Sequence, residues 1–333
     1  MLKNLICLIA LLLPVVTHAA NTKPTCEPGC TTPWTNCYGS FTWATGEKYT
    51  GEWLGGLASG KGELTYANGS TYKGDFKSNT FNGKGVFIST NGDKYIGDWL
   101  DGKATGHATL FYLADSAQKG NKYIGKFKDG LRDGHGIYYY VNKDKFIGEW
   151  KSDMANGLGM YLHRADDYRR GDKFVGNYID SEETGHGAYI FANGGRYIGD
   201  FKGGKLNGMG TYSDEYIQYK GEFKDYVYHG HGYLTNKFLG RYVGAFENGK
   251  FNGQGVFTYK GGDIYTGAWK NGRQNGQGEY KYLAENVFKG DTYIGEWKNG
   301  KPTSIIQRTK LHIIEIYEIL RLMSATTTPT PLR

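Results

Sequence analysis

Residues 49–70 read YTGEWLGGLASGKGELTYANGS, and residues 72–93 repeat the pattern as YKGDFKSNTFNGKGVFISTNGD. Both stretches hold an aromatic residue, a glycine two positions later, a second aromatic and then a Gly-X-Gly pair. The pattern starts eleven times, at Tyr49, Tyr72, Tyr95, Tyr123, Phe146, Phe174, Tyr197, Tyr219, Tyr242, Tyr265 and Tyr293. The steps are 22 or 23 residues, except for three of 28. Such a period indicates one supersecondary unit stacked on its neighbours.

Each unit has the sequence signature of a β-hairpin. In Tyr49-Thr50-Gly51-Glu52-Trp53, alternation with a period of two predicts a strand with both aromatics on one face. We expect aromatics of neighbouring hairpins to close over the slot at the glycine, since a glycine inside a strand otherwise weakens a sheet. Turn residues follow, the Gly-X-Gly pair opens a second strand, and Asn-Gly or Gly-Gly marks the reversal into the next unit.

The predicted fold is therefore all-β: an elongated, single-sheet antiparallel array of β-hairpins over residues 39–302. Residues 303–333 are expected to form an apolar helical tail with a disordered end. The tail could cap the open sheet edge, dock to a partner or membrane, or be an accidental extension.

The first 20 residues resemble an export signal. Lys3 precedes an apolar run from Leu5 to Val16, and small residues follow at Ala19 and Ala20. The run is shorter than the roughly 20 residues of a membrane span. We expect an exported protein, either periplasmic, secreted or at the cell surface, with an uncleaved membrane anchor as the alternative.

Three cysteines lie in residues 21–38, a predicted N-terminal cap. Export favours one disulfide among Cys26, Cys30 and Cys37, with Cys37 as the common partner and one thiol left over. Extending the repeat frame backwards puts Cys26 and Cys30 where aromatics belong, so a disulfide would replace the missing half of a cap hairpin. A metal site is the alternative, although three cysteines without a nearby histidine make a poor tetrahedral set.

The stretches YTGEWLGGLASGKG, YIGDWLDGKATGHA and YIGEWKNGK resemble the MORN (membrane occupation and recognition nexus) repeat. The resemblance covers about residues 39–301. It implies a twisted sheet of hairpins with an aromatic-lined groove, and association with phospholipid binding, membrane-junction scaffolding and oligomerisation. Plant phosphatidylinositol-phosphate kinases carry such repeats beside a kinase domain. No kinase domain follows the repeats in this sequence, so the resemblance implies no catalysis.

Candidate binding residues come from two features of the repeats. The three longer units are extended before the next unit, and the extension at residues 163–171 is the most basic, through Arg164, Arg169 and Arg170. It is either a contact edge or a solvated insertion. The aromatics of the repeat supply the other candidates, which are Tyr49, Trp53, Tyr95, Trp99 and Trp150.

The sequence gives little support for catalysis, cofactors or metals. The histidines at 107, 135, 186 and 231 all stand at the middle position of the Gly-X-Gly pair, which reads Gly-His-Ala at His107, so each is on its own hairpin, roughly 10 Å from the next copy. The acidic residue of each unit is expected on a solvated face. The Gly-X-Gly pairs precede strands, unlike those of dinucleotide loops. The formal charge of +7, or +6 without Lys3, lacks the dense basic runs of nucleic-acid binders.

The sequence thus favours an exported, non-enzymatic scaffold that mediates protein–protein interaction or oligomerisation. Phospholipid, phosphoinositide or membrane-surface binding is the alternative. Glycan binding on an aromatic groove is a third possibility.

Overall fold

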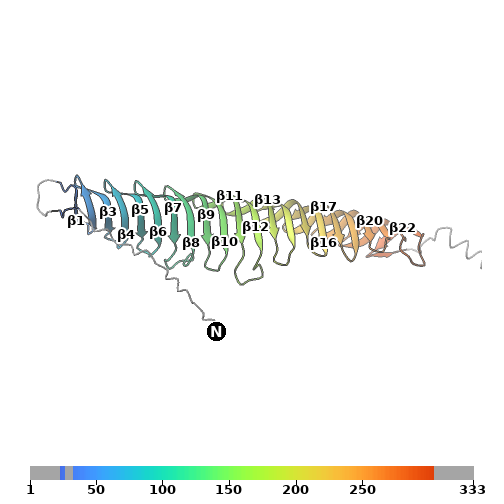
Figure 1. Ribbon diagram of the computed structural model, residues 1–333. Coiled ribbons are helices and arrows are strands. Elements are labelled where there is room, and N and C mark those ends of the chain that lie inside the picture. Colours follow the sequence, from blue (N-terminus) through green and yellow to red (C-terminus); the bar gives the residue numbers. More distant parts are fainter. Residues whose placement is uncertain (1–22, 27–32, 304–333) are drawn as a thin grey trace, which may run out of the picture. The chain divides into compact units, whose positions relative to one another are not determined.

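The computed structural model describes residues 23–26 and 33–303, and the chain divides into two compact units, up to Gly106 and from His107 onward. Every regular element of the described residues is a β-strand (Figure 1). The first unit contains β1 (Cys37–Thr42), β2 (Lys48–Leu54), β3 (Leu57–Thr65), β4 (Thr71–Lys77), β5 (Thr80–Ile88) and β6 (Lys94–Leu100), and β7 (Lys103–Phe111) contains the boundary. The second unit contains β8 (Lys122–Lys128), β9 (Leu131–Tyr139), β10 (Lys145–Lys151), β11 (Met154–Leu162), β12 (Lys173–Ile179), β13 (Glu182–Ile190), β14 (Arg196–Lys202), β15 (Lys205–Ser213), β16 (Ile217–Lys224), β17 (Val227–Asn236), β18 (Gly240–Glu247), β19 (Lys250–Tyr259), β20 (Ile264–Lys270), β21 (Arg273–Lys281), β22 (Thr292–Lys298) and β23 (Lys301–Pro302).

Within each unit, strands that follow one another in the sequence pair antiparallel, which confirms the predicted all-β hairpin-repeat fold. The predicted export signal, residues 1–20, and the predicted helix of the tail lie outside the described residues.

The two glycines of each Gly-X-Gly pair have different roles. In the hairpin of β2 and β3, the register shifts between Gly51 and Trp53, and Gly60 lies in this bulge with a φ of +94°. That left-handed conformation favours glycine. Gly62 instead faces Gly51 across the ladder, and a Cβ on Gly62 would lie 2.3 Å from the Tyr49 hydroxyl oxygen. The second glycine is therefore required by the ring packed on it.

The ring over the glycine slot belongs to the same hairpin, which corrects the expectation that neighbouring hairpins close it. Tyr49 folds back over Gly51 and Gly62, and its hydroxyl donates a 3.0 Å hydrogen bond to the Glu52 carbonyl. The Tyr49 ring can lie here because the residue two positions later on the same face of the strand is Gly51, which has no Cβ to clash with the ring. A neighbouring hairpin packs on the ring edge instead, with Phe76 at 4.8 Å between ring centroids.

The hairpins join through edge-to-face contacts between aromatic rings. In the second unit, the first aromatic of one hairpin meets the second aromatic of the next, as in Tyr123 with Trp150 at 5.2 Å and Phe174 with Phe201 at 4.8 Å. Edge-to-face pairs at such distances are favourable beyond their buried area. The core is thus a row of rings on one face of the sheet, and its stability depends on nearest neighbours.

A buried acid before the first strand closes several hairpins. Oδ2 of Asp144 accepts the Tyr161 hydroxyl at 2.9 Å, and Oδ1 accepts the backbone N–H groups of Arg164 and Ala165. The contacts join the entry of the hairpin to the loop that leaves it. Equivalent bonds are made by Asp172 with Tyr189 and Ala192, and by Asp263 with Tyr280 and Ala284. At Asn121 the side-chain amide instead donates to the Tyr138 hydroxyl, while its Oδ1 accepts the Val141 N–H. We call this arrangement the polar latch.

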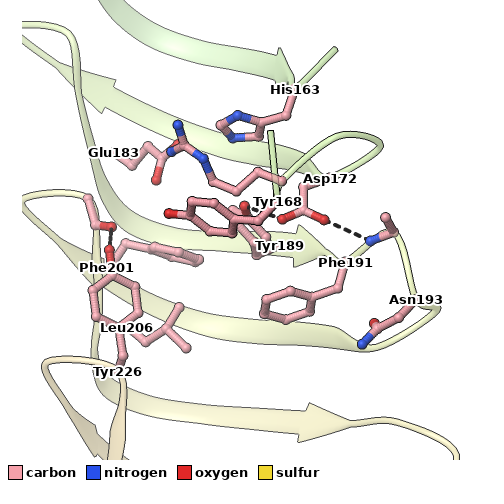
Figure 2. Close-up of a pocket in the computed structure, with 13 residues that line it drawn as sticks. His163, Tyr168, Asp172, Glu183, Tyr189, Phe191, Asn193, Phe201, Leu206 and Tyr226 are labelled. Atoms are coloured by element: carbon pink, nitrogen blue, oxygen red, sulfur yellow. Dashed lines mark hydrogen bonds between the residues drawn. The ribbon is translucent and has the colours of Figure 1, made fainter. Parts of the chain in front are cut away.

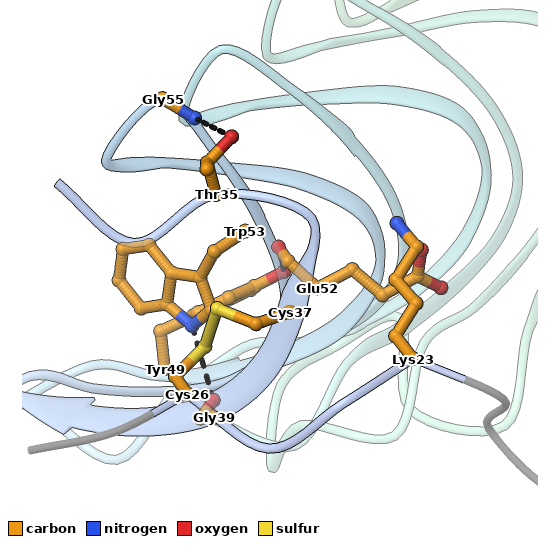
Figure 3. The surroundings of a disulfide bond; sticks show 9 residues. All are labelled: Lys23, Cys26, Thr35, Cys37, Gly39, Tyr49, Glu52, Trp53 and Gly55. Atoms are coloured by element: carbon orange, nitrogen blue, oxygen red, sulfur yellow. Dashed lines mark hydrogen bonds and ion pairs between the residues drawn. A yellow bond between two sulfur atoms is a disulfide. The ribbon is translucent and has the colours of Figure 1, made fainter.

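A disulfide between Cys26 and Cys37 covers the start of the first unit (Figure 3). Cys37 is the partner that the sequence predicted, and Cys30 lies outside the described residues. Gly39 stands opposite Gly51, and a Cβ on Gly39 would lie 2.9 Å from the Cβ of Cys26. The disulfide therefore takes the place of the tyrosine ring that covers this glycine position in later units, as the extended repeat frame predicted.

Candidate functional site

The aromatic candidates lie in the core. The exposed fraction is 0% for Tyr49, 5% for Trp53, 6% for Tyr95, 9% for Trp99 and 7% for Trp150. Their rings pack on each other and on glycine, and the Trp53 indole donates to the Gly39 carbonyl at 3.1 Å. The structure gives these side chains a packing role, and a ligand role for them stays a prediction.

The arginine-rich loop carries its own counter-charges. Arg170 pairs with Asp166 at 2.7 Å, and Nη2 of Arg169 lies 3.8 Å from an Asp167 carboxylate oxygen. Arg164 is exposed and follows β11. Because acids within the loop offset two of its three arginines, the loop presents less positive charge than its arginine count suggests.

The three long loops share one conformation. Each has an i,i+4 ion pair, which is Asp115 with Lys119, Asp166 with Arg170, and Glu285 with Lys289. Each also has a polar side chain that accepts a backbone N–H two residues later, which is Ser116 with Gln118, Asp167 with Arg169, and Asn286 with Phe288. The loops can therefore be compared position by position, and Tyr168 and Arg169 correspond to Val287 and Phe288.

The acidic residue that stands between the glycine and the second aromatic of a unit, such as Glu52, stabilises the bulge of its hairpin. Glu52 Oε1 accepts the Lys61 N–H across the bulge at 3.1 Å, and Asp200 Oδ2 accepts the Met209 N–H at 3.1 Å in the same way. Asp200 also lies 3.2 Å from Nδ1 of His186 on the preceding hairpin. Among residues 23–26 and 33–303, no three His, Cys, Asp or Glu side chains gather as metal ligands do.

The outer face of the second unit carries a feature that the sequence reasoning missed. One residue per strand, paired in register from β8 to β14, forms an unbroken aliphatic stripe: Ile124, Ile137, Ile147, Met160, Val175, Ala188 and Ile198. Exposure reaches 38% at Ile124 and 43% at Ile198. The signal was present in the sequence as the residue between the first aromatic and its glycine, which is often Ile or Val.

A basic row lies beside the aliphatic stripe, two residues earlier on the first strand of each hairpin. It consists of Lys122, Lys145, Lys173 and Arg196. Tyr139 stands between Lys122 and Lys145, whose ammonium groups lie 4.7 and 4.9 Å from its ring centroid. The outer face thus combines aliphatic surface with a cationic border.

The second unit also contains a cavity of about 480 Å³, which the sequence reasoning did not find. Figure 2 shows its lining from His163 at one end to Tyr226 at the other. The lining comprises His163, Tyr168, Arg169, Asp172, Glu183, Tyr189, Phe191, Ala192, Asn193, Phe201, Gly204, Leu206 and Tyr226. Backbone bonds align the turns at this site, since Gly204 N–H donates to the Glu183 carbonyl at 3.0 Å and Tyr226 N–H to the Leu206 carbonyl at 3.1 Å.

Two polar groups of the cavity are buried without a hydrogen-bond partner among the described residues. They are Nδ1 of His163, which is only 7% exposed, and Nε of Arg169. Burial raises the pKa of Glu183 to about 7, against the opposing effects of Arg169 and the Tyr178 hydroxyl. Burial, together with the Arg169 charge, lowers the pKa of His163. Unmatched donors and acceptors lining a cavity indicate a site able to hydrogen-bond a ligand.

These features define an all-β repeat protein with an aromatic core, an aliphatic outer stripe and one mixed-polarity cavity. The family model of the MORN repeat matches residues 49–71, 72–94, 95–112, 123–145, 146–164, 174–196, 197–215, 219–236, 242–264, 265–282 and 293–303. The chain therefore belongs to the MORN repeat family. The matched segments begin at the aromatics with which the sequence pattern starts.

Comparison with solved structures yields only distant similarity. The TCP domain of Drosophila melanogaster SAS-4 (dCPAP), solved with a proline-rich motif of Ana2 (dSTIL), is 13% identical, with a TM-score of 0.29 over 56% of this chain and 87% of that chain. A mutant TCP10 domain of Danio rerio CPAP is 8% identical, with a TM-score of 0.25 over 69% and 92%. No curated protein sequence matches the chain. In the described part of the chain, no helix has the length and apolar character needed to cross a bilayer.

Proposed function

We propose that this MORN-repeat protein is an exported, non-enzymatic scaffold whose outer face binds a protein partner. The aliphatic stripe from Ile124 to Ile198 is the observation that carries this proposal. Solvent-exposed side chains of a strand are normally polar when nothing covers them, whereas this stripe continues over consecutive strands. Covering it would remove apolar surface from water, which is the main favourable contribution to most protein association.

Charge specifies the kind of partner. The basic row borders the aliphatic stripe along β8 to β14, so the complementary surface is aliphatic with an acidic border. Complementary charge raises the association rate and selects among apolar surfaces that would otherwise compete.

A membrane surface is the second candidate, because the basic row would also attract anionic lipid. The exposure of the stripe favours the protein partner. Ile124, Val175 and Ile198 are 38%, 42% and 43% exposed, so more than half of each side chain is covered by its neighbours in the sheet. Side chains that lie flush with a sheet suit a facing protein surface better than insertion into lipid.

A photo-crosslinking experiment tests the proposal. A photoreactive amino acid replaces Val175 in the stripe or, as a control, Val141, which is 64% exposed in the loop after β9. We expect one protein to cross-link from position 175 and not from position 141, and to be lost when Ile124→Thr and Ile198→Thr are added. Equal cross-linking from both positions would contradict the proposal.

Vesicle flotation separates the two candidates. Binding to vesicles containing phosphatidylserine that falls with added salt, together with no specific cross-linked protein, would favour the membrane surface. Export is tested separately by N-terminal sequencing of the mature protein. A start after Ala19 or Ala20 is expected, and a chain that retains Met1 in the cytoplasm would reject export.

A further inference from the structure

Internal repetition supplies a reference for every position in the second unit, and departures from that reference converge on the cavity. His163 occupies a position that is aromatic in several other hairpins, as Tyr112, Tyr140, Phe191 and Tyr282, and is Asp214 in one. Glu183 faces the second aromatic of its hairpin, where Ala155, Leu206, Tyr228 and Phe251 stand in four other hairpins and Arg132 and Gln274 in two more, so Glu183 is the acidic member of this row. The second residue of the turn is Tyr226, where other turns have glycine, asparagine, aspartate or serine.

Each departure is unfavourable for folding alone. Tyr226 adopts a φ of +72°, a left-handed conformation that is strained for a bulky residue. His163 buries Nδ1 without a partner, where tyrosine or phenylalanine would bury none. Glu183 brings a carboxyl group into a row that otherwise holds apolar residues, tyrosine, Arg132 and Gln274. Unfavourable choices that gather at one cavity point to a ligand, because strain and unmatched polar groups concentrate at functional sites.

The chemistry of the lining restricts the ligand. Arg169 and His163 offer unmatched nitrogens, and Glu183 offers carboxyl oxygens. The lining sets the Arg169 guanidinium among the carboxyl groups of Glu183 and Asp172, so the cavity has no strong preference for an anion or a cation. Asp172 is already committed to the Tyr189 hydroxyl at 2.8 Å and the Ala192 N–H.

Aromatic rings at the cavity provide apolar surface on which a ligand can stack. Tyr168 is 92% exposed and Tyr226 is 56% exposed, with the Tyr226 hydroxyl fixed by a 2.6 Å hydrogen bond to the Gly204 carbonyl. Phe201 and Leu206 are buried at the base. A pyranose ring has C–H groups that stack on such rings and hydroxyls that both donate and accept hydrogen bonds.

We propose that this cavity binds a neutral sugar, as one or two pyranose rings of a free saccharide or glycan chain. Tyr168 and Tyr226 stack on the ring, while Arg169, His163 and Glu183 hydrogen-bond its hydroxyls. The site is separate from the outer-face stripe, since the aromatics lining it belong to the opposite face of the sheet from Val175 and Ile198. The two proposals can therefore fail independently.

The test uses the full mature chain and isothermal titration with a panel of neutral monosaccharides and disaccharides. Glucuronate and inorganic phosphate serve as anionic probes, and choline as a cationic probe. We expect a neutral sugar to bind saturably, and Tyr168→Ala or Glu183→Ala to weaken it roughly tenfold or more. Val287→Ala, at the matching position of the loop after β21, should change affinity by less than about twofold.

Tyr226→Gly provides a variant in which the melting temperature separates loss of binding from misfolding, because glycine is the residue found in most of these turns. We expect it to raise the melting temperature and to weaken sugar binding. Saturable binding of only the charged probes, unchanged sugar affinity in Tyr168→Ala and Glu183→Ala, or no saturable binding of any sugar in the panel would each overturn the proposal. None of these results bears on cross-linking at Val175.

Discussion

The Tyr161 hydroxyl donates a 2.9 Å hydrogen bond to the Asp144 carboxylate, which is 3% exposed. Asp144→Ala would remove this acceptor and leave two loop N–H groups without their partner. We expect the free energy of unfolding to fall by roughly 2–4 kcal/mol, as for buried hydrogen bonds to a charged group. Urea denaturation measures the change. Asp166→Ala, in an exposed ion pair, is the control and should stay within about 0.5 kcal/mol.

Acid should weaken the same contact. Burial alone would raise the pKa of Asp144, but hydrogen bonds from Arg164, Ala165 and Tyr161 lower it overall. A lowered folded-state pKa gives stability that is present above the unfolded value of about 3.9 and is lost as pH falls through the folded value. Asp144→Asn should therefore lose less stability than wild type when the pH falls from about 5 to 2. Parallel losses in the two proteins would contradict this assignment. Asn121 shows that the amide fits the latch.

Glu183 should show the opposite pH dependence. Its folded pKa of about 7 lies above the unfolded value near 4.3, so folding becomes less favourable as pH rises between them. Glu183→Gln should change stability little at about pH 4 and raise it by about 1–2 kcal/mol at pH 8. Thermal unfolding at both pH values provides the measurement. A gain that is the same at both would mean that the carboxyl is well solvated.

The glycine under a tyrosine ring should not tolerate a methyl group. A Cβ on Gly210 would lie 2.4 Å from Cε2 of Tyr197. We expect Gly210→Ala to cost about 2–3 kcal/mol through overpacking. Gly261→Ala is the control, because its new Cβ would meet only the Ala284 Cβ at 3.4 Å. Similar denaturation midpoints for the two variants would reject the packing role of the second glycine.

The disulfide should protect the start of the first unit alone. Cys37→Ser removes the bond to Cys26 and should cost about 2–3 kcal/mol locally. Hydrogen exchange should accelerate in β1, while strands of the second unit keep their protection because hairpins depend on nearest neighbours. Uniform acceleration over the chain would show instead that the array unfolds as one cooperative block.

The hairpins could be predicted from the sequence because aromatic and glycine positions recur with a fixed period. The ring over Gly51 was assigned to the wrong hairpin, since spacing alone does not show whether Tyr49 folds back or reaches forward. The role of Asp144 was missed because its partners, Tyr161 near the end of the second strand and Arg164 and Ala165 after it, are distant in sequence. The binding candidates were chosen by residue type, and burial of Trp53 and Trp150 depends on contacts between hairpins that the sequence does not state. The cavity could not be predicted because it depends on the conformation of the loop that places Arg169 in the same lining as Glu183.

The polar latch has a consequence for the proposed export of this chain. Asp144, Tyr161 and Ala165 all fall within one hairpin and its exit loop, so the latch is complete once that short segment is available. A polypeptide that leaves a translocation pore with its N-terminus first can therefore satisfy each buried carboxylate as soon as the corresponding loop emerges. Only the aromatic ring of the most recent hairpin then lacks its contact, which the next hairpin supplies. The amount of unfinished surface stays constant during delivery, however many hairpins the chain contains.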